Sequence, residues 1–274
     1  SLKIDMGHSS NISLIDRLEL VTDHTTGFYT NYDVYAYAIS ADSYEYSFDG
    51  KSYQTSNKMV YTSNKASASL KSKDNLGNES SVLEFSINNI DKDVPLCESN
   101  DGNTTWAPSK TVKVHCGDLM SGCRNEYYST TYPTGSIKNA KTGSITIYDK
   151  AGNSRNCTVN VYVDSTPPVC NASITKNGGG SVASGDTVKG DVTFNGSGTD
   201  NESSASGLKS VTWKVTKGSN SYDNLTSTSG LGTGTYSVYA TCKDVAGNTS
   251  TSSTKTVRIT QSALISFNAN GGTG

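Results

Sequence analysis

The sequence predicts an all-β chain built from three tandem β-sandwich modules. One pattern, Asp-x-x-Gly-Asn, occurs three times and begins at Asp74, Asp149 and Asp244. Apolar and polar residues alternate before and after each copy, and this period of two is typical of half-buried strands. Asp accepts a hydrogen bond from a backbone N–H two residues on, and Gly tolerates positive φ. Each copy is therefore expected to form the turn between two strands.

The alternation predicts which side chains of these strands point into a core. The predicted inward residues come before and after each turn, at even spacing. They are Ala66, Ala68, Leu70, Phe85 and Ile87 around the first copy, Ile145, Ile147, Val159, Val161 and Val163 around the second, and Val238, Ala240, Cys242, Val257 and Ile259 around the third.

The repeat spacing predicts a first module at residues 1–90, a second at 91–163 and a third at 164–260, with 261–274 as a linker or the start of a further β module. Linkers that begin at Asp91 and Asp164 carry prolines, which fix φ and remove a strand donor. The first module holds eight of the sixteen tyrosines. Aromatic residues favour strands, so a structural role is the default, and a tyrosine-lined face that binds sugar is the alternative.

Composition excludes several classes of partner. A net charge of −2 with mixed signs gives no electrostatic reason to expect nucleic acid or an anionic membrane. No apolar run approaches the roughly 20 residues that span a bilayer. No signal peptide is recognisable, so we expect a mature piece of a longer protein. Six cysteines without zinc-site spacing indicate disulfides and an oxidising compartment, the alternative being a cytosolic protein with reduced thiols.

Catalysis is not expected. Nucleophilic catalysis needs a nucleophile and a base in contact, oriented by a third group. The three histidines, His8, His24 and His115, stand in no recognisable motif. A Lys–Asn isopeptide bond would need a buried Lys beside an acid, and the spacing singles out no such trio.

The repeated motif, the proline-bearing linkers and the Ser-Gly loops before Cys123 and Leu208 together resemble tandem bacterial immunoglobulin-like (Big-type) domains. That family builds the stalks of large secreted or wall-attached surface proteins and adhesins. The resemblance implies three immunoglobulin-like sandwiches in an extended, monomeric arrangement at the bacterial cell surface. It is weaker in the first module, where Met6 follows Asp5 without the linker proline. The tail from Ile265 is similar to the opening of a Listeria–Bacteroides repeat.

The cysteines can be paired by comparing the repeats. Cys97 and Cys170 follow matching prolines, and the third module has only Cys242 as a partner for Cys170. The four cysteines of the second module allow three connectivities. Cys116 aligns with Gly196 of the third module and Cys123 aligns with Leu208. Because these two cysteines occur together only in the second module, they are expected to pair with each other. The predicted disulfides are Cys170–Cys242, Cys116–Cys123 and Cys97–Cys157.

Acidic residues form the one predicted site. In a seven-strand sandwich, the start of the first strand lies at the same end as two of the loops. Several carboxylates there suit Ca²⁺, which takes six to eight oxygen ligands, and some stalks of this family bind calcium at module junctions. The alternative is that each Asp caps its own turn. The expected ligands are Asp91, Asp93, Asp118 and Asp149 at one junction, and Asp164, Asp200, Glu202 and Asp244 at the next.

The function expected from these observations is a non-catalytic structural or adhesive stalk segment of a bacterial surface protein. A second hypothesis is a module whose tyrosine-rich first part binds glycan or host protein. A third is an accessory region of a secreted glycan-degrading enzyme. An exposed aromatic face in the first module would favour the second hypothesis, and buried tyrosines would favour the first.

Overall fold

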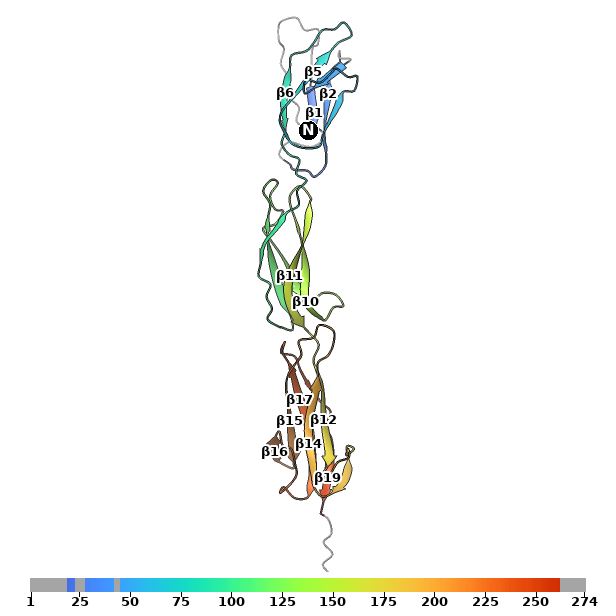
Figure 1. Ribbon diagram of the computed structural model, residues 1–274, viewed down its shortest axis with the longest axis vertical. Coiled ribbons are helices and arrows are strands. Elements are labelled where there is room, and N and C mark those ends of the chain that lie inside the picture. Colours follow the sequence, from blue (N-terminus) through green and yellow to red (C-terminus); the bar gives the residue numbers. More distant parts are fainter. Residues whose placement is uncertain (1–18, 23–27, 42–44, 262–274) are drawn as a thin grey trace, which may run out of the picture. The chain divides into compact units, whose positions relative to one another are not determined.

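Strands, turns and loops make up the part of the chain that the computed structural model describes, residues 19–22, 28–41 and 45–261 (Figure 1). No helix occurs in these ranges, and hence none that could cross a membrane. The prediction of an all-β fold is confirmed. His8, His24 and the tail from Ile265 lie outside the described residues.

Contacts divide the chain into two compact units. Unit 1 comprises Ser1–Asp101, Lys113–Ser129 and Ser144–Thr158, and unit 2 comprises Gly102–Val112, Thr130–Gly143 and Val159–Gly274. Four strands, β8 to β11, contribute residues to both units. The three-module boundaries therefore stay a prediction.

The N-terminal strands, all in unit 1, form two three-stranded sheets around one core. One sheet has the order β1 (Glu19–Thr22), β2 (Val34–Ile39), β4 (Lys58–Tyr61), and the other has the order β3 (Glu45–Phe48), β5 (Lys65–Lys73), β6 (Leu83–Ile87). Buried side chains of both sheets, among them Val34, Phe48 and Leu70, pack into a single cluster. Asp49 and Gly50 turn the chain at positive φ (55° and 68°), as the Asp-Gly pair predicts.

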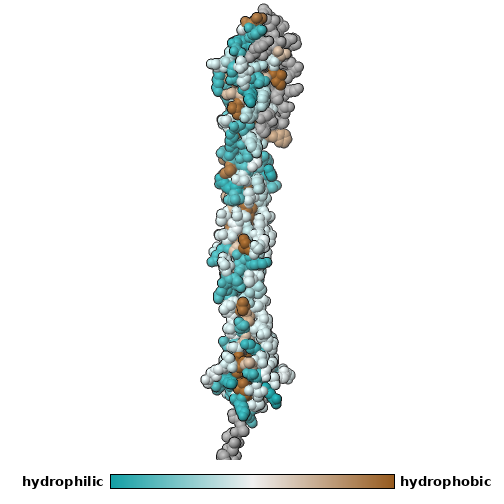
Figure 2. All heavy atoms as spheres, turned by 90° about the vertical axis from the view of Figure 1, so that its right-hand side faces the viewer, coloured by the Kyte–Doolittle hydropathy of each residue, from teal (hydrophilic) through white to brown (hydrophobic). Residues whose placement is uncertain are grey.

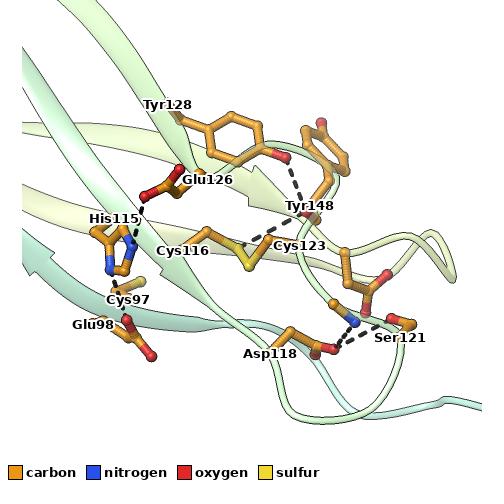
Figure 3. The surroundings of a disulfide bond; sticks show 12 residues. Cys97, Glu98, His115, Cys116, Asp118, Ser121, Cys123, Glu126, Tyr128 and Tyr148 are labelled. Atoms are coloured by element: carbon orange, nitrogen blue, oxygen red, sulfur yellow. Dashed lines mark hydrogen bonds and ion pairs between the residues drawn. A yellow bond between two sulfur atoms is a disulfide. The ribbon is translucent and has the colours of Figure 1, made fainter.

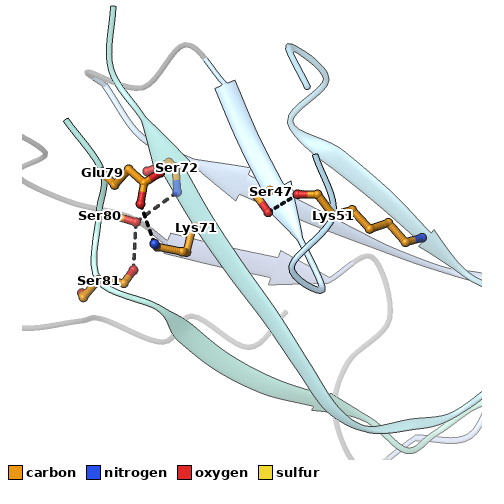
Figure 4. A network of polar contacts seen from close by, with 7 residues as sticks. All are labelled: Ser47, Lys51, Lys71, Ser72, Glu79, Ser80 and Ser81. Carbon is orange, nitrogen blue, oxygen red and sulfur yellow. Dashed lines mark hydrogen bonds and ion pairs between the residues drawn. The ribbon is translucent and has the colours of Figure 1, made fainter. Parts of the chain in front are cut away.

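Polar contacts tie neighbouring strands near this core (Figure 4). The Ser72 N–H donates to Ser80 Oγ at 3.0 Å, and Lys71 Nζ lies 2.6 Å from Glu79 Oε2. These contacts hold the segment after the first Asp-x-x-Gly-Asn turn against β5.

The middle strands comprise a three-stranded sheet and a hairpin. The sheet has the order β7 (Leu96–Asn100), β8 (Lys110–Gly117), β9 (Tyr127–Tyr132), and β10 (Asn139–Tyr148) pairs with β11 (Ser154–Asp164). The second Asp-x-x-Gly-Asn copy connects β10 to β11. Ile145, Ile147, Val159, Val161 and Val163 are all buried, as the alternation predicts.

The C-terminal strands, in unit 2, form two sheets that enclose a second core. One is the pair β12 (Val169–Lys176) and β14 (Val192–Thr199). The other has the order β13 (Asp186–Lys189), β19 (Lys255–Thr260), β17 (Gly234–Asp244), β15 (Leu208–Lys217), β16 (Asn220–Asp223), with β18 (Thr249–Thr251) paired to β17. Phe194 and Ile174 from the first sheet pack with Tyr236 and Val238 from the second.

The side chains predicted to point into the cores are buried, with one exception. Ala68 and Leu70 are buried, but Ala66 is exposed. The pairing of β5 with β6 shifts register between Lys65 and Ala68, and such a bulge breaks the strict alternation of side chains. On the face that Figure 2 shows, apolar side chains form small separate spots among polar ones.

Candidate functional site

The three Asp-x-x-Gly-Asn copies form the same hydrogen-bonded turn. Asp244 Oδ1 accepts from the N–H groups of Gly247 at 2.6 Å and Asn248 at 2.8 Å, and Asp244 Oδ2 accepts from Asn248 Nδ2 at 2.7 Å. Asp149 makes the same three contacts in its own copy, each at 2.7 Å. Asp74 also accepts two backbone N–H groups and the Asn78 side-chain amide, but its first backbone donor is Leu76, one residue earlier than the Gly of the other copies. Each aspartate therefore caps its turn.

The aspartates that open the two linkers also have matching partners. Asp164 Oδ1 accepts from the Thr166 N–H at 3.0 Å, its Oδ2 from the Ser206 N–H at 2.7 Å, and its backbone oxygen from Asn248 Nδ2 at 2.8 Å. The corresponding donors to Asp91 are the N–H groups of Asp93 (3.1 Å) and Ser121 (3.0 Å) and the Nδ2 of Asn153 (2.9 Å). The linker carboxylate is thus held by a loop, and the backbone oxygen of the same residue is held by the Asn of the turn.

A third aspartate completes each group from a loop that follows a strand. Asp118 Oδ1 accepts from the Gly122 N–H at 2.6 Å and from two further donors of the same loop. Asp200 Oδ2 accepts from the Gly207 N–H at 2.8 Å. Asp200 Oδ1 is buried and has no hydrogen-bond partner.

These residues converge in two acidic clusters, one within each unit. The first acidic cluster is Asp91, Asp118 and Asp149, and the second is Asp164, Asp200 and Asp244. In each cluster, one carboxylate oxygen from every member lies within 4.8 Å of the others. Oxygen groups at this spacing can share a hard divalent cation.

The structure brings six of the eight predicted ligands into these clusters. Asp93 and Glu202 are exposed and belong to neither. Sequence reasoning missed the donors that hold the linker aspartates, Ser121, Ser206, Asn153 and Asn248. The signal was present, because Ser-Gly recurs in both loops and Asn ends every copy of the turn motif.

The second acidic cluster carries an electrostatic cost. Burial raises the pKa of Asp200 to about 6, and the nearby charges of Asp164 and Asp244 act in the same direction. Asp164 and Asp244 are fully buried and Asp200 is 6% exposed. Ionised carboxylates this close repel one another unless a cation or donors offset the charge.

The cysteines join as Cys97–Cys157, Cys116–Cys123 and Cys170–Cys242, the three pairs expected from the sequence. One alignment behind that expectation was wrong. In the strand register, Cys97 of β7 lies opposite Cys116 of β8, and Cys170 of β12 lies opposite Gly198 of β14. The counterpart of Cys116 in the third module is therefore Gly198 and not Gly196. Both glycines lie on the same face of β14, which the alternation alone does not distinguish.

His115 lies beside the Cys116–Cys123 disulfide (Figure 3). Its Nδ1 is 2.6 Å from Glu98 Oε2, and its Nε2 is 3.8 Å from Glu126 Oε1. Tyr127 packs against the imidazole with the ring centroids 5.0 Å apart. These contacts place His115 beside two carboxylates and an aromatic ring on the surface.

The tyrosines of the first module divide between core and surface. Tyr46 and Tyr61 are buried in the core. Tyr35 and Tyr37 lie on the opposite face of β2, stacked with centroids 6.4 Å apart, and Tyr35 is 36% exposed. Tyr32, in the loop before β2, is 70% exposed. An aromatic face is therefore present beside the buried tyrosines.

No family model matches the sequence, and no curated protein matches it. Among solved structures, a bacterial ice-binding adhesin studied for host cell surface retention shares 16% identity, with a TM-score of 0.33 over 92% of this chain and 99% of that chain. A tetra-tandem repeat from the extending region of a large adhesion protein shares 13% identity, with a TM-score of 0.30 over 88% and 73%. The FN1–FN3 domains of chicken CNTN1 share 7%, with a TM-score of 0.27 over 88% and 97%.

Proposed function

We propose that this chain is a non-catalytic structural and adhesive segment of a secreted or wall-attached bacterial surface protein, built from tandem immunoglobulin-like modules. The observation that supports this proposal is a set of hydrogen bonds made by the linker aspartate, which occurs twice and is called the linker device below. The Asp91 N–H donates to Thr30 O at 2.8 Å, while the Asp91 carboxylate accepts from Ser121 in the following module. The Asp164 N–H donates to Ala107 O at 3.0 Å, and the Asp164 carboxylate accepts from Ser206.

This device couples successive modules through one residue. The backbone of the linker aspartate extends the last strand of one module, and its side chain orders a loop of the next. Thr30 forms a parallel bridge with Ile90, and Ala107 forms the same bridge with Val163. In the proposed stalk, tension would pass from one module to the next through this residue. Three disulfides suit the same oxidising extracellular setting.

The proposal assigns Ca²⁺ to the acidic clusters. Its support is the ligand chemistry: every potential metal ligand in the two clusters is a carboxylate, and Asp200 Oδ1 is buried without a partner. Buried polar atoms almost always have partners, so an orphaned carboxylate oxygen on a member of this cluster fits a bound cation. Asp164, Asp200 and Asp244 would hold the ion in the second cluster. The ion would supply the positive charge that lets three buried carboxylates stay ionised together.

An extended particle is the expected result of small-angle scattering. A compact globule of 274 residues would have a radius of gyration of about 19 Å. Three modules, each as long as the 11-residue strand β11 at about 3.3 Å per residue, would span about 110 Å end to end, with a radius of gyration of about 30 Å. A value near that of the globule would contradict the stalk proposal.

The exposed aromatic face favours a second candidate function, the binding of glycan by the first module. Tyr35 and Tyr37 stack on β2, with Ile39 on the same strand 49% exposed and Val60 of β4 41% exposed. Side chains at alternate positions of neighbouring strands share one face of a sheet. Aromatic faces of this kind can stack against the apolar side of a sugar ring.

Glycan binding predicts that Tyr35→Ala/Tyr37→Ala abolishes capture on a glycan array while the melting temperature changes little. Tyr46→Phe in the core is the matched control, and it should leave glycan capture unchanged. If the wild-type chain retains no glycan on the array, the second candidate fails and the stalk proposal is unaffected.

A further inference from the structure

The two acidic clusters differ in the loops that supply their third carboxylate. The loop of the first cluster, residues 117–122, is closed by the Cys116–Cys123 disulfide (Figure 3). Cys123 also forms a β-bridge with Asp149, and the Lys150 N–H donates to Gly122 O at 2.9 Å. The covalent closure thus joins the strand that leads into Asp118 to Cys123, the residue that pairs with Asp149.

The carboxylate of Asp118 is well supplied with donors inside this closed loop. Its Oδ1 accepts from the Met120 N–H at 3.2 Å, the Ser121 Oγ at 3.3 Å and the Gly122 N–H at 2.6 Å. Hydrogen bonds to an ionised carboxylate lower the free energy of its charged form. The loop therefore keeps its shape by bonds internal to the protein.

The second cluster has the same positions without the covalent tie. Gly198 and Leu208 stand where Cys116 and Cys123 stand in the first. A Cβ added to Gly198 would lie 3.3 Å from Leu208 Cδ1, so the two positions are adjacent but joined only by packing.

The loop of the second cluster is also longer and less well supported. It runs from Asp200 to Gly207, and Ser204 adopts a φ of 59°, a conformation that non-glycine residues seldom occupy. Asp200 accepts one hydrogen bond, from Gly207, and its Oδ1 has none. This loop has hydrogen bonds of its own, among them Ala205 N–H to Glu202 O at 3.0 Å and Ala246 N–H to Ser206 Oγ at 3.1 Å, but no counterpart of the disulfide or of the three donors to one carboxylate oxygen.

We infer that the two clusters are ordered by different means: the Cys116–Cys123 disulfide fixes the first loop without a cation, and a divalent cation fixes the second. This inference rests on the calcium site proposed above and specifies which cluster depends on it. A disulfide limits the conformations of the open loop in advance, so little further order is gained when an ion binds. In the second loop the ion itself must bring the carboxylates together.

Hydrogen exchange of four backbone amides tests the inference in the intact chain. Ser121 and Gly122 donate to the first cluster, and Ser206 and Gly207 donate to the second. Their protection is measured in calcium and in chelator. With calcium at ten times its Kd, the protection of Ser206 and Gly207 should rise about tenfold over that in chelator. The protection of Ser121 and Gly122 should change less than about twofold, because an ion that also binds the disulfide-constrained open loop adds little protection.

Two variants test the two clusters separately, each with the other cluster as its control. Cys116→Ser/Cys123→Ser should lower the protection of Ser121 and Gly122 in chelator and leave Ser206 and Gly207 unchanged. Asp200→Asn should remove the calcium response of Ser206 and Gly207 and leave the first loop unchanged.

Equal calcium responses of both amide pairs would overturn the inference and leave the calcium proposal standing. An unchanged first loop in the Cys116→Ser/Cys123→Ser protein would also overturn it. If calcium protects none of the four amides, the calcium proposal itself fails, and the inference fails with it. Should the double variant not fold, the wild-type comparison of the two amide pairs still decides.

Discussion

Removal of the Cys170–Cys242 disulfide should destabilise unit 2 by about 4 kcal/mol, since the bond closes a loop of 72 residues. Both sulfurs belong to strands that enclose the core, and Cys242 is fully buried. In Cys170→Ala/Cys242→Ala, the unfolded chain regains the conformational entropy that closure of this long loop removes. Small domains have a total stability of about 5–15 kcal/mol, so the loss would be a large share of it.

The measurement is denaturant unfolding followed by Trp213 fluorescence in a Trp106→Phe background. Trp213 packs against the core of unit 2, so its emission reports that unit. Cys116→Ala/Cys123→Ala is the matched control, because that bond spans only seven residues and lies in unit 1. The control should leave the Trp213 transition in place. An equal shift in both variants would show that loop closure is not the source of the stability.

Much of the fold follows from local sequence because buried and exposed side chains alternate along most of the long strands. Val238, Ala240 and Cys242 are inward in β17 for the same reason that Val159 and Val161 are inward in β11. Ala66 departs from this rule because the bulge in the ladder depends on how β5 meets β6. The sequence of one strand does not show how it is aligned with a partner strand, so a bulge of this kind cannot be predicted from it.

Those parts of the candidate site that recur in the repeats could be predicted from the sequence. The linker and turn aspartates recur at matching positions, so their convergence follows from the common end of a sandwich. Asp93 and Glu202 lie close in the chain to cluster members but are exposed and belong to neither cluster, because loop conformation decides which of two nearby carboxylates becomes buried. The roles of Ser121 and Ser206 depend on backbone N–H groups, which side-chain identity does not show.

The difference between the clusters was not predictable from composition. Asp118 and Asp200 are equivalent in sequence, yet Asp118 has three donors to one oxygen and Asp200 has one orphaned oxygen. The cause is loop length, since a short closed loop turns its own N–H groups toward the carboxylate. The longer loop spreads its N–H groups over more residues.

Calcium should raise the melting temperature of unit 2, and Asp200→Asn should abolish that rise. The unfolded chain cannot assemble three carboxylates in one place, so binding favours the folded state by about 2.7 kcal/mol when calcium stands at a hundred times its Kd. In chelator the same variant should be more stable than the wild type at pH 7. The neutral amide avoids the burial and charge repulsion that raise the pKa of Asp200 to about 6.

The expected gain in chelator is roughly 1–3 kcal/mol, from a pKa difference of about two units at about 1.4 kcal/mol each. Its sign follows from linkage. A carboxyl whose pKa is raised on folding binds its proton more tightly in the folded state, so its favourable contribution is full below about pH 4 and is lost as the pH rises through about 6. The advantage of Asp200→Asn in chelator should therefore vanish near pH 4.

Asp74→Asn is the control for the turn itself, because Asp74 caps the first copy of the motif and belongs to neither acidic cluster. It should weaken its own turn equally in calcium and in chelator. Asp223→Asn controls for charge, since the Asp223 side chain is 81% exposed. Identical melts of the wild type in millimolar calcium and in chelator would mean that the aspartates of the second cluster serve only as turn caps. In that case the orphaned Asp200 oxygen would need another partner.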